Sequence, residues 1–91
     1  MFSLLYVDDE PGLLELGKLF LESTGEFEVT TALSADAGLK QLAQQDFDAI
    51  VSDFQMPVMD GIELLKRVRM SFGSIPFVLF TGRGREEIVI E

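Results

Sequence analysis

The chain has 91 residues, of which 47% are hydrophobic and 25% charged, a balance typical of one small globular domain. Its net charge of −9, from 16 acidic and 7 basic residues, repels nucleic acids and anionic membranes. Because the sequence contains neither cysteine nor histidine, disulfides, zinc sites of the Cys/His type and histidine-dependent triads are excluded.

No apolar run approaches the roughly 18 residues that a membrane-spanning helix needs. The amino terminus lacks the basic start of a signal peptide. Together with the absence of cysteine, this predicts a cytoplasmic protein. We therefore expect neither a membrane nor a nucleic acid among its partners.

The predicted elements alternate between strands and helices in chain order. Short apolar or β-rich runs predict four strands, at residues 3–7, 27–32, 47–53 and 74–82. The stretches between the predicted strands are amphipathic and predict three helices. This order indicates an α/β fold, a doubly wound parallel sheet with helices on both faces.

Each predicted helix has a recognisable start. Pro11 suits the first turn of a helix that runs to about Ser23. Ser34 is a typical N-cap residue, and Asp60 followed by Glu63 resembles a capping box. The buried face of the first helix is predicted to consist of apolar residues and one glycine, namely Leu13, Leu16, Gly17, Phe20 and Leu21.

Polar side chains follow three of the four predicted strands. Asp8 and Asp9 end the first, Asp53 ends the third and Thr81 ends the fourth. Because the carboxyl ends of parallel strands meet at one edge of the sheet, these side chains are expected to converge. Three carboxylates close together raise one another's pKa unless a cation lies between them, and Mg²⁺ prefers oxygen ligands. The sequence therefore predicts a divalent cation site.

Each of these residues also has a purely local interpretation. Asp9 or Glu10 could cap the helix at Pro11, Asp53 could form a turn with its own backbone, and Thr81 could simply end its strand. Capping alone does not explain why all of them follow strands at one edge of one sheet. Their coincidence favours the cation site.

Three segments together resemble the receiver domain of the response regulators of two-component signalling. These are VDDE at 7–10, VSDFQMPVMDG at 51–61 and FTG at 80–82. The resemblance extends from Leu4 to about Glu91, so residues 1–91 are expected to form a single receiver domain. It implies a flavodoxin-like fold and a role in signalling rather than an enzyme acting on a separate substrate.

The resemblance also implies a role for each site residue. Asp53 would accept a phosphoryl group from a sensor histidine kinase or a phosphotransfer domain in a Mg²⁺-dependent reaction. Asp9, Asp53 and the backbone carbonyl of Gln55 would bind Mg²⁺ directly, and Asp8 would bind it through a water. Thr81 would contact the phosphoryl group and act as the switch.

The chain departs from the family after the fourth strand. The family has a fifth strand and a closing helix, whereas this chain ends at Glu91, within what the family makes its fourth helix. The fold is therefore expected to be incomplete, with four strands. The family's lysine on strand five has no counterpart, which predicts weakened phosphotransfer.

This departure has consequences for the fourth strand and for the tail. Residues 74–82 would form an exposed apolar edge, which predicts self-association as a homodimer. The tail EEIVIE at 86–91 is expected to be the beginning of a cut helix. Its three β-branched residues leave an added strand as the alternative.

Two other functions are compatible with parts of the sequence. The missing lysine and the exposed edge suit a phosphorylation-independent module for protein interaction or dimerisation. A Mg²⁺-dependent phosphatase of the haloacid-dehalogenase type also places Asp after its first strand, but it needs an Asp-x-Asp pair. The run Asp8-Asp9-Glu10 does not provide that pair, which argues against the phosphatase.

Overall fold

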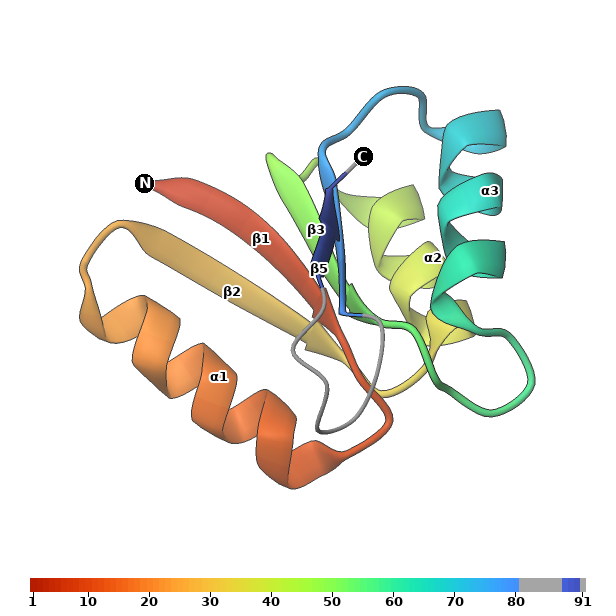
Figure 1. Cartoon of the computed structure of the whole chain (residues 1–91). Coiled ribbons are helices and arrows are strands. Elements are labelled where there is room, and N and C mark those ends of the chain that lie inside the picture. Colours follow the sequence, from red (N-terminus) through yellow and green to blue (C-terminus); the bar gives the residue numbers. More distant parts are fainter. Residues whose placement is uncertain (81–87, 91) are drawn as a thin grey trace.

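The computed structural model describes residues 1–80 and 88–90, which form three layers, with a sheet between helices (Figure 1). The sheet has the strand order β2-β1-β3-β4-β5, in which β1 to β4 are parallel and β5 is antiparallel to β4. The strands are β1 (Phe2–Val7), β2 (Phe27–Ala32), β3 (Ala49–Asp53), β4 (Phe77–Phe80) and β5 (Ile88–Ile90). The helices are α1 (Pro11–Ser23), α2 (Ala35–Gln44) and α3 (Gly61–Ser71). The predicted doubly wound parallel sheet is confirmed.

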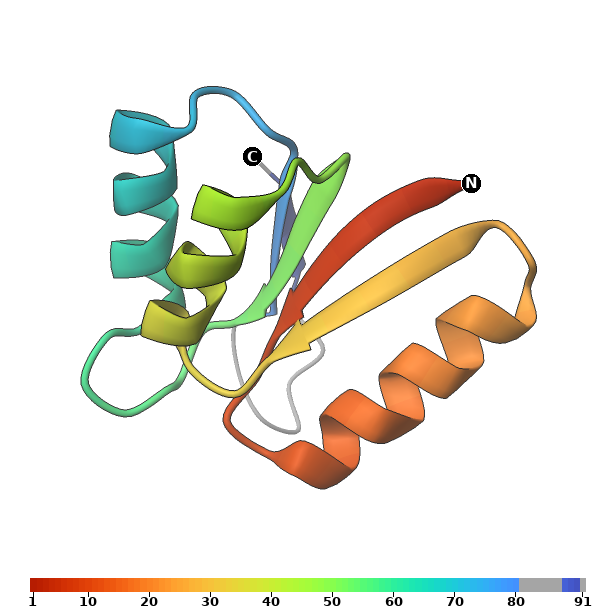
Figure 2. The same ribbon diagram turned by 180° about the vertical axis from the view of Figure 1, so that it is seen from behind.

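The main core lies between the sheet and the pair α2 and α3. Figures 1 and 2 show α1 on one face of the sheet and the other two helices on the opposite face. Leu5, Ile50 and Phe77 from three neighbouring strands are completely buried there, as are Leu64 and Val68 of α3. Burial of these large side chains provides most of the hydrophobic stabilisation of the fold. None of the described helices is long and apolar enough to cross a bilayer.

All three predicted helix starts are confirmed, and α1 begins at Pro11. At the other two, the expected side chain makes a capping hydrogen bond. The Ser34 hydroxyl accepts a hydrogen bond from the Ala37 N–H at 3.1 Å. The Asp60 carboxylate accepts one from the Glu63 N–H at 2.9 Å. Each bond satisfies a backbone donor that has no partner within its helix. The starts of α2 and α3 are therefore fixed by local chemistry.

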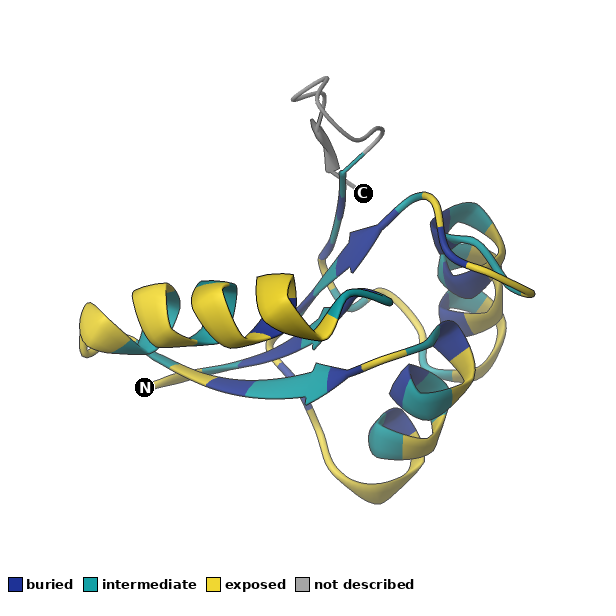
Figure 3. Ribbon diagram, turned by 90° about the horizontal axis from the view of Figure 1, so that it is seen from below, coloured by how far each residue is buried: buried dark blue, intermediate teal, exposed yellow. Residues whose placement is uncertain are grey.

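The predicted buried face of α1 is right for Gly17 and Leu21, which are partly buried, and wrong for Leu13, Leu16 and Phe20, which are exposed. Leu14 is the buried residue of this helix, whereas Leu16 and Phe20 are 65% and 70% exposed. Leucines occur on several sides of α1, so apolar spacing does not select one face. The face that packs on the sheet is determined by Gly17, which lies so close to the ring of Tyr6 that a Cβ at this position would overlap the ring. Figure 3 shows the resulting exposed outer side of α1.

The carboxyl-terminal residues form a strand, so the predicted cut helix is wrong and the alternative is right. β5 pairs with β4 in antiparallel register, with Phe80 opposite Ile88 and Val78 opposite Ile90. Three consecutive β-branched residues favour extended backbone over helix. Because β5 pairs with the outer side of β4, the prediction of an exposed edge at β4 is also wrong.

Candidate metal and phosphoryl site

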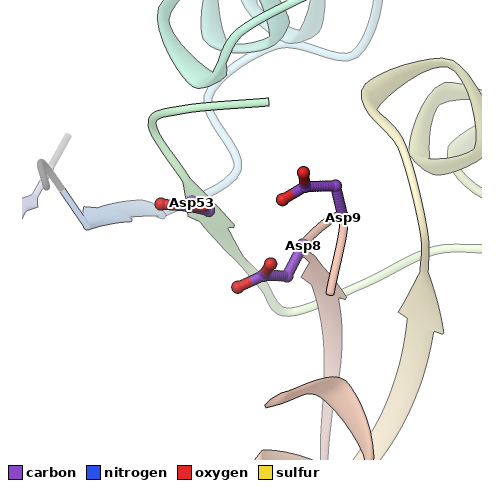
Figure 4. Close-up of side chains that lie close together, drawn as sticks. All are labelled: Asp8, Asp9 and Asp53. Carbon is purple, nitrogen blue, oxygen red and sulfur yellow. The ribbon is translucent and has the colours of Figure 1, made fainter. Parts of the chain in front are cut away.

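Three carboxylates meet at the carboxyl edge of the sheet. Asp8 and Asp9 follow β1 and Asp53 ends β3, the next strand in the sheet (Figure 4). The register pairs Val7 with Ser52, so the residues that follow, Asp8 and Asp53, lie side by side. One oxygen from each of the three carboxylates lies within 4.8 Å of the others. This spacing suits a single cation bound by several oxygens.

Burial makes this cluster electrostatically unfavourable in the absence of a cation. Asp8 and Asp53 are only 5% and 6% exposed. Burial raises the pKa of Asp8, and the charges of Asp53, Asp9 and Glu10 raise it further, while the hydrogen bond from the Glu10 N–H lowers it. Burial, together with Asp8 and Asp53, also raises the pKa of Tyr6. A divalent cation reverses this balance, because it stabilises the charged carboxylates.

The loop after Asp53 is held in place by backbone hydrogen bonds. The Phe54 N–H donates to the Phe80 carbonyl and the Gly61 N–H donates to the Phe54 carbonyl, each at 2.8 Å. A Cβ at Gly61 would lie 2.5 Å from the Asp53 carbonyl oxygen, so only glycine allows this approach. At the outer tip, Val58 has a φ of 71°, a strained value for a β-branched residue. The start of α3 thereby fixes the backbone of Asp53.

The structure brings together some of the predicted site residues and leaves others untested. Asp8, Asp9 and Asp53 lie together as predicted. Gln55 lies two residues beyond Asp53 on the same loop and is exposed, and metal binding by its carbonyl stays a prediction. Thr81 lies outside the described residues.

The capping interpretation explains only part of the acidic run. Glu10 occupies the N-cap position of α1, but its side chain makes no capping hydrogen bond. The Asp8 carboxylate instead accepts a hydrogen bond from the Glu10 N–H at 3.0 Å. That single bond involves one oxygen of one residue, so capping does not account for three converging carboxylates.

Sequence reasoning missed two residues beside the cluster. The fully buried Ser52 donates its hydroxyl hydrogen to the Asp53 carbonyl at 2.9 Å. Tyr6, two residues before Asp8, is partly buried, and its pKa is raised by burial and by the charges of Asp8 and Asp53. A polar side chain within each apolar strand was the available signal, since such residues are seldom buried without a partner.

Replacing Asp8 with asparagine is expected to stabilise the metal-free chain at pH 7, by about 1 kcal/mol. Folding raises the pKa of Asp8 above its ordinary value of 3.8, so the folded chain favours the protonated carboxyl. The contribution of Asp8 to stability is therefore complete below pH 3.8 and is lost as the pH rises through the raised pKa. Urea unfolding in EDTA between pH 3 and pH 8 measures this effect. The exposed Asp46→Asn is the control, and equal pH dependence in wild type and Asp8→Asn would contradict the prediction.

The chain belongs to the response regulator receiver domain family, whose model matches residues 4–91. It is 40% identical over 84 residues to the response regulator Rre1 of Synechocystis, which covers 90% of this chain and 36% of that protein. The chain thus spans about a third of the length of this relative. The family assignment establishes a receiver domain of two-component signalling and argues against the phosphatase alternative.

Two solved structures that contain a response regulator are similar to this chain. The response regulator TrrA of Thermotoga maritima, in complex with Mg²⁺ and BeF, matches with a TM-score of 0.84 and 30% identity over 92% of this chain and 72% of that chain. The histidine kinase ThkA in complex with TrrA gives a match with a TM-score of 0.82 and 29% identity, over 96% of this chain and 76% of that chain. Both TM-scores indicate that this chain shares the fold of these receiver structures.

Proposed function

We propose that this chain is a Mg²⁺-dependent phosphoacceptor domain and that Asp53 is the residue phosphorylated. The observation that carries the proposal is the approach of Asp8, Asp9 and Asp53 to within 4.8 Å at one edge of the sheet. The relative TrrA, whose structure contains Mg²⁺ and BeF, supports it. The domain acts as a phosphoacceptor over residues 1–91 rather than as an enzyme on a separate substrate.

The chemistry assigned to the chain is a single displacement at phosphorus. A carboxylate oxygen of Asp53 attacks the phosphorus of a phosphohistidine, the P–N bond breaks and an acyl phosphate forms. Asp9, Asp53 and the Gln55 carbonyl hold Mg²⁺ directly, and Asp8 holds it through a water. When bound, Mg²⁺ offsets the negative charge on the transferring phosphoryl group. Thr81 is proposed to contact the phosphoryl oxygen and act as the switch.

The proposed partner is a sensor histidine kinase or a phosphotransfer domain. The complex of ThkA with TrrA supports a kinase as the donor. We place this reaction in the cytoplasm, in line with the cysteine-free sequence. A homodimer through β4 is not proposed, because β5 pairs with that edge. This pairing also removes the exposed edge as a reason to expect a phosphorylation-independent interaction module.

Beryllofluoride, which mimics a phosphoryl group, tests the assignment without requiring the unknown kinase. Addition of Mg²⁺ and beryllofluoride together is expected to raise the Tm by several degrees, because ligands that bind only the folded state stabilise it. Beryllofluoride alone is expected to leave the Tm unchanged. A folded chain whose Tm and NMR spectrum do not respond to the two together would overturn the proposal.

A further inference from the structure

One polar side chain lies within the main hydrophobic core. Val7, Ser52 and Leu79 are in register across β1, β3 and β4. Ser52 follows the core residue Ile50 by two positions, so this row faces α2 and α3 as Ile50 does. Val7 and Ser52 are 0% exposed and Leu79 is 1% exposed. Ser52 therefore places a hydroxyl in a row whose other two members are aliphatic.

A serine at this position is unfavourable unless its hydroxyl is used. Burial removes the hydroxyl from water, whereas alanine would fill nearly the same space with apolar atoms alone. The Ser52 hydroxyl donates a hydrogen bond to the Asp53 carbonyl oxygen at 2.9 Å. This hydrogen bond, rather than packing, accounts for a serine in the core.

The hydrogen bond holds one end of the peptide group that joins Asp53 to Phe54. At the other end of the same group, the Phe54 N–H donates to the Phe80 carbonyl at 2.8 Å. A peptide group is planar and rigid, so holding both of its ends fixes its orientation. The peptide group after Asp53 is thus held by a side chain of β3 on one side and by the backbone of β4 on the other.

The start of α3 lies against the same peptide group. A Cβ at Gly61 would lie 2.5 Å from the Asp53 carbonyl oxygen and 3.0 Å from the Phe54 Cα. The Gly61 N–H also donates to the Phe54 carbonyl at 2.8 Å. Together with the Ser52 hydrogen bond, these contacts restrict the backbone on both sides of Phe54.

This peptide group lies between two of the proposed metal ligands. Asp53 is proposed to bind Mg²⁺ through its carboxylate, and Gln55 through its backbone carbonyl. Mg²⁺ requires nearly ideal octahedral geometry with short bonds to oxygen, so a small displacement of one ligand relative to another weakens binding. The relative position of these two ligands depends on the orientation of the peptide group between them.

We propose that Ser52 is a positioning residue of the metal and phosphoryl site. Its hydroxyl fixes the peptide group after Asp53 and thereby holds the Asp53 carboxylate in place beside Asp8 and Asp9. Ser52 acts through Asp53 and not on the phosphoryl group itself. This inference rests on the proposed function, because it concerns the same site.

Ser52→Ala tests the role of the hydroxyl in the full chain. In a calorimetric titration, this variant is expected to bind Mg²⁺ about tenfold more weakly than wild type, as found when groups that orient metal ligands are removed. Ser52→Cys keeps the size of the side chain but provides a weaker donor, so its loss of affinity is expected to be intermediate. A role in packing alone would leave Ser52→Cys equal to wild type.

Ile50→Val is the matched control variant. Ile50 lies on the same strand and the same face as Ser52, and it is also 0% exposed. Its replacement removes one methyl group from the core and leaves the peptide group after Asp53 unchanged. The Mg²⁺ affinity of this variant is expected to stay within about twofold of wild type. Urea unfolding of both variants separates a loss of stability from a loss of metal binding.

Amide hydrogen exchange in EDTA provides a readout that does not depend on Mg²⁺. The Phe54 N–H is expected to exchange about tenfold faster in Ser52→Ala than in wild type, because its peptide group is then held less firmly. Ile50→Val is expected to leave this rate within about twofold of wild type.

Mg²⁺ binding by wild type distinguishes failure of this inference from failure of the proposed function. If wild type binds Mg²⁺ and Ser52→Ala either binds it equally well or exchanges the Phe54 N–H at the wild-type rate, the role of Ser52 is wrong and the proposed function stands. Equal weakening by Ile50→Val would also overturn the role of Ser52, because metal affinity would then follow the stability of the core. Folded wild type that does not bind Mg²⁺ would overturn both.

Discussion

Replacing Asp53 with asparagine is expected to abolish incorporation of a phosphoryl group from acetyl phosphate. The amide lacks the anionic oxygen that attacks phosphorus, and no other described carboxylate lies both at the end of β3 and within the cluster. Incorporation, measured as the fraction of chain with the mass of one added phosphoryl group, is expected to fall at least about 100-fold. The substitution preserves side-chain size, so the variant is expected to fold.

Asp46→Asn is the control for this measurement, because Asp46 is exposed and precedes β3 rather than ending it. Its incorporation is expected to equal that of wild type in Mg²⁺ and to vanish for both proteins in EDTA. Undiminished incorporation in Asp53→Asn would show that another residue is the phosphoacceptor.

Replacing Gly61 with alanine is expected to lower the free energy of unfolding by about 3 kcal/mol, more than any other substitution considered for this chain. The added Cβ would overlap a methyl group of Leu79 and lie 2.5 Å from the Asp53 carbonyl oxygen. A side-chain methyl could move aside, but the carbonyl belongs to the β3 backbone and is fixed by the sheet. Relief of the overlap therefore requires a shift of Asp53, so Mg²⁺ binding is expected to weaken as well.

Gly12→Ala is the matched control for this loss. Gly12 lies in the first turn of α1, and a Cβ there would meet no atom within 4 Å. Alanine is the better helix former, so this variant is expected to be as stable as wild type or up to about 1 kcal/mol more stable. Urea unfolding of both variants gives the comparison. A Gly61→Ala chain as stable as Gly12→Ala would show that the loop after β3 is not rigid.

Local patterns predicted the elements and the acidic edge because the relevant signals lie within a few residues. The alternation in 27–32 matches β2, and the hydroxyl of Ser34 begins α2 as predicted. Asp8 and Asp53 are 45 positions apart, yet a parallel sheet with strand ends at one edge suffices to bring them together. The positions of the strand ends in the sequence were therefore sufficient to predict that these carboxylates lie together.

The predictions for α1 and for the tail were wrong where the structure of a segment depends on the elements that pack against it. The buried face of α1 depends on the fit of Gly17 to Tyr6 on β1, and apolar residues all around the helix conceal that choice. The tail was predicted to be helical from its position in the family, whereas β5 pairs with β4. Three β-branched residues gave the better local signal, and the availability of the β4 edge decided the outcome.

The most direct test of the central claim, that the three carboxylates form one Mg²⁺ site, is calorimetric titration of Mg²⁺ into wild type and Asp9→Asn. Asp9 is a partly exposed member of the cluster, so its replacement removes a ligand without disturbing the core. We expect one Mg²⁺ to bind per wild-type chain and the variant to bind Mg²⁺ at least about tenfold more weakly. Folded wild type that does not bind Mg²⁺, or equal binding by the two proteins, would contradict it.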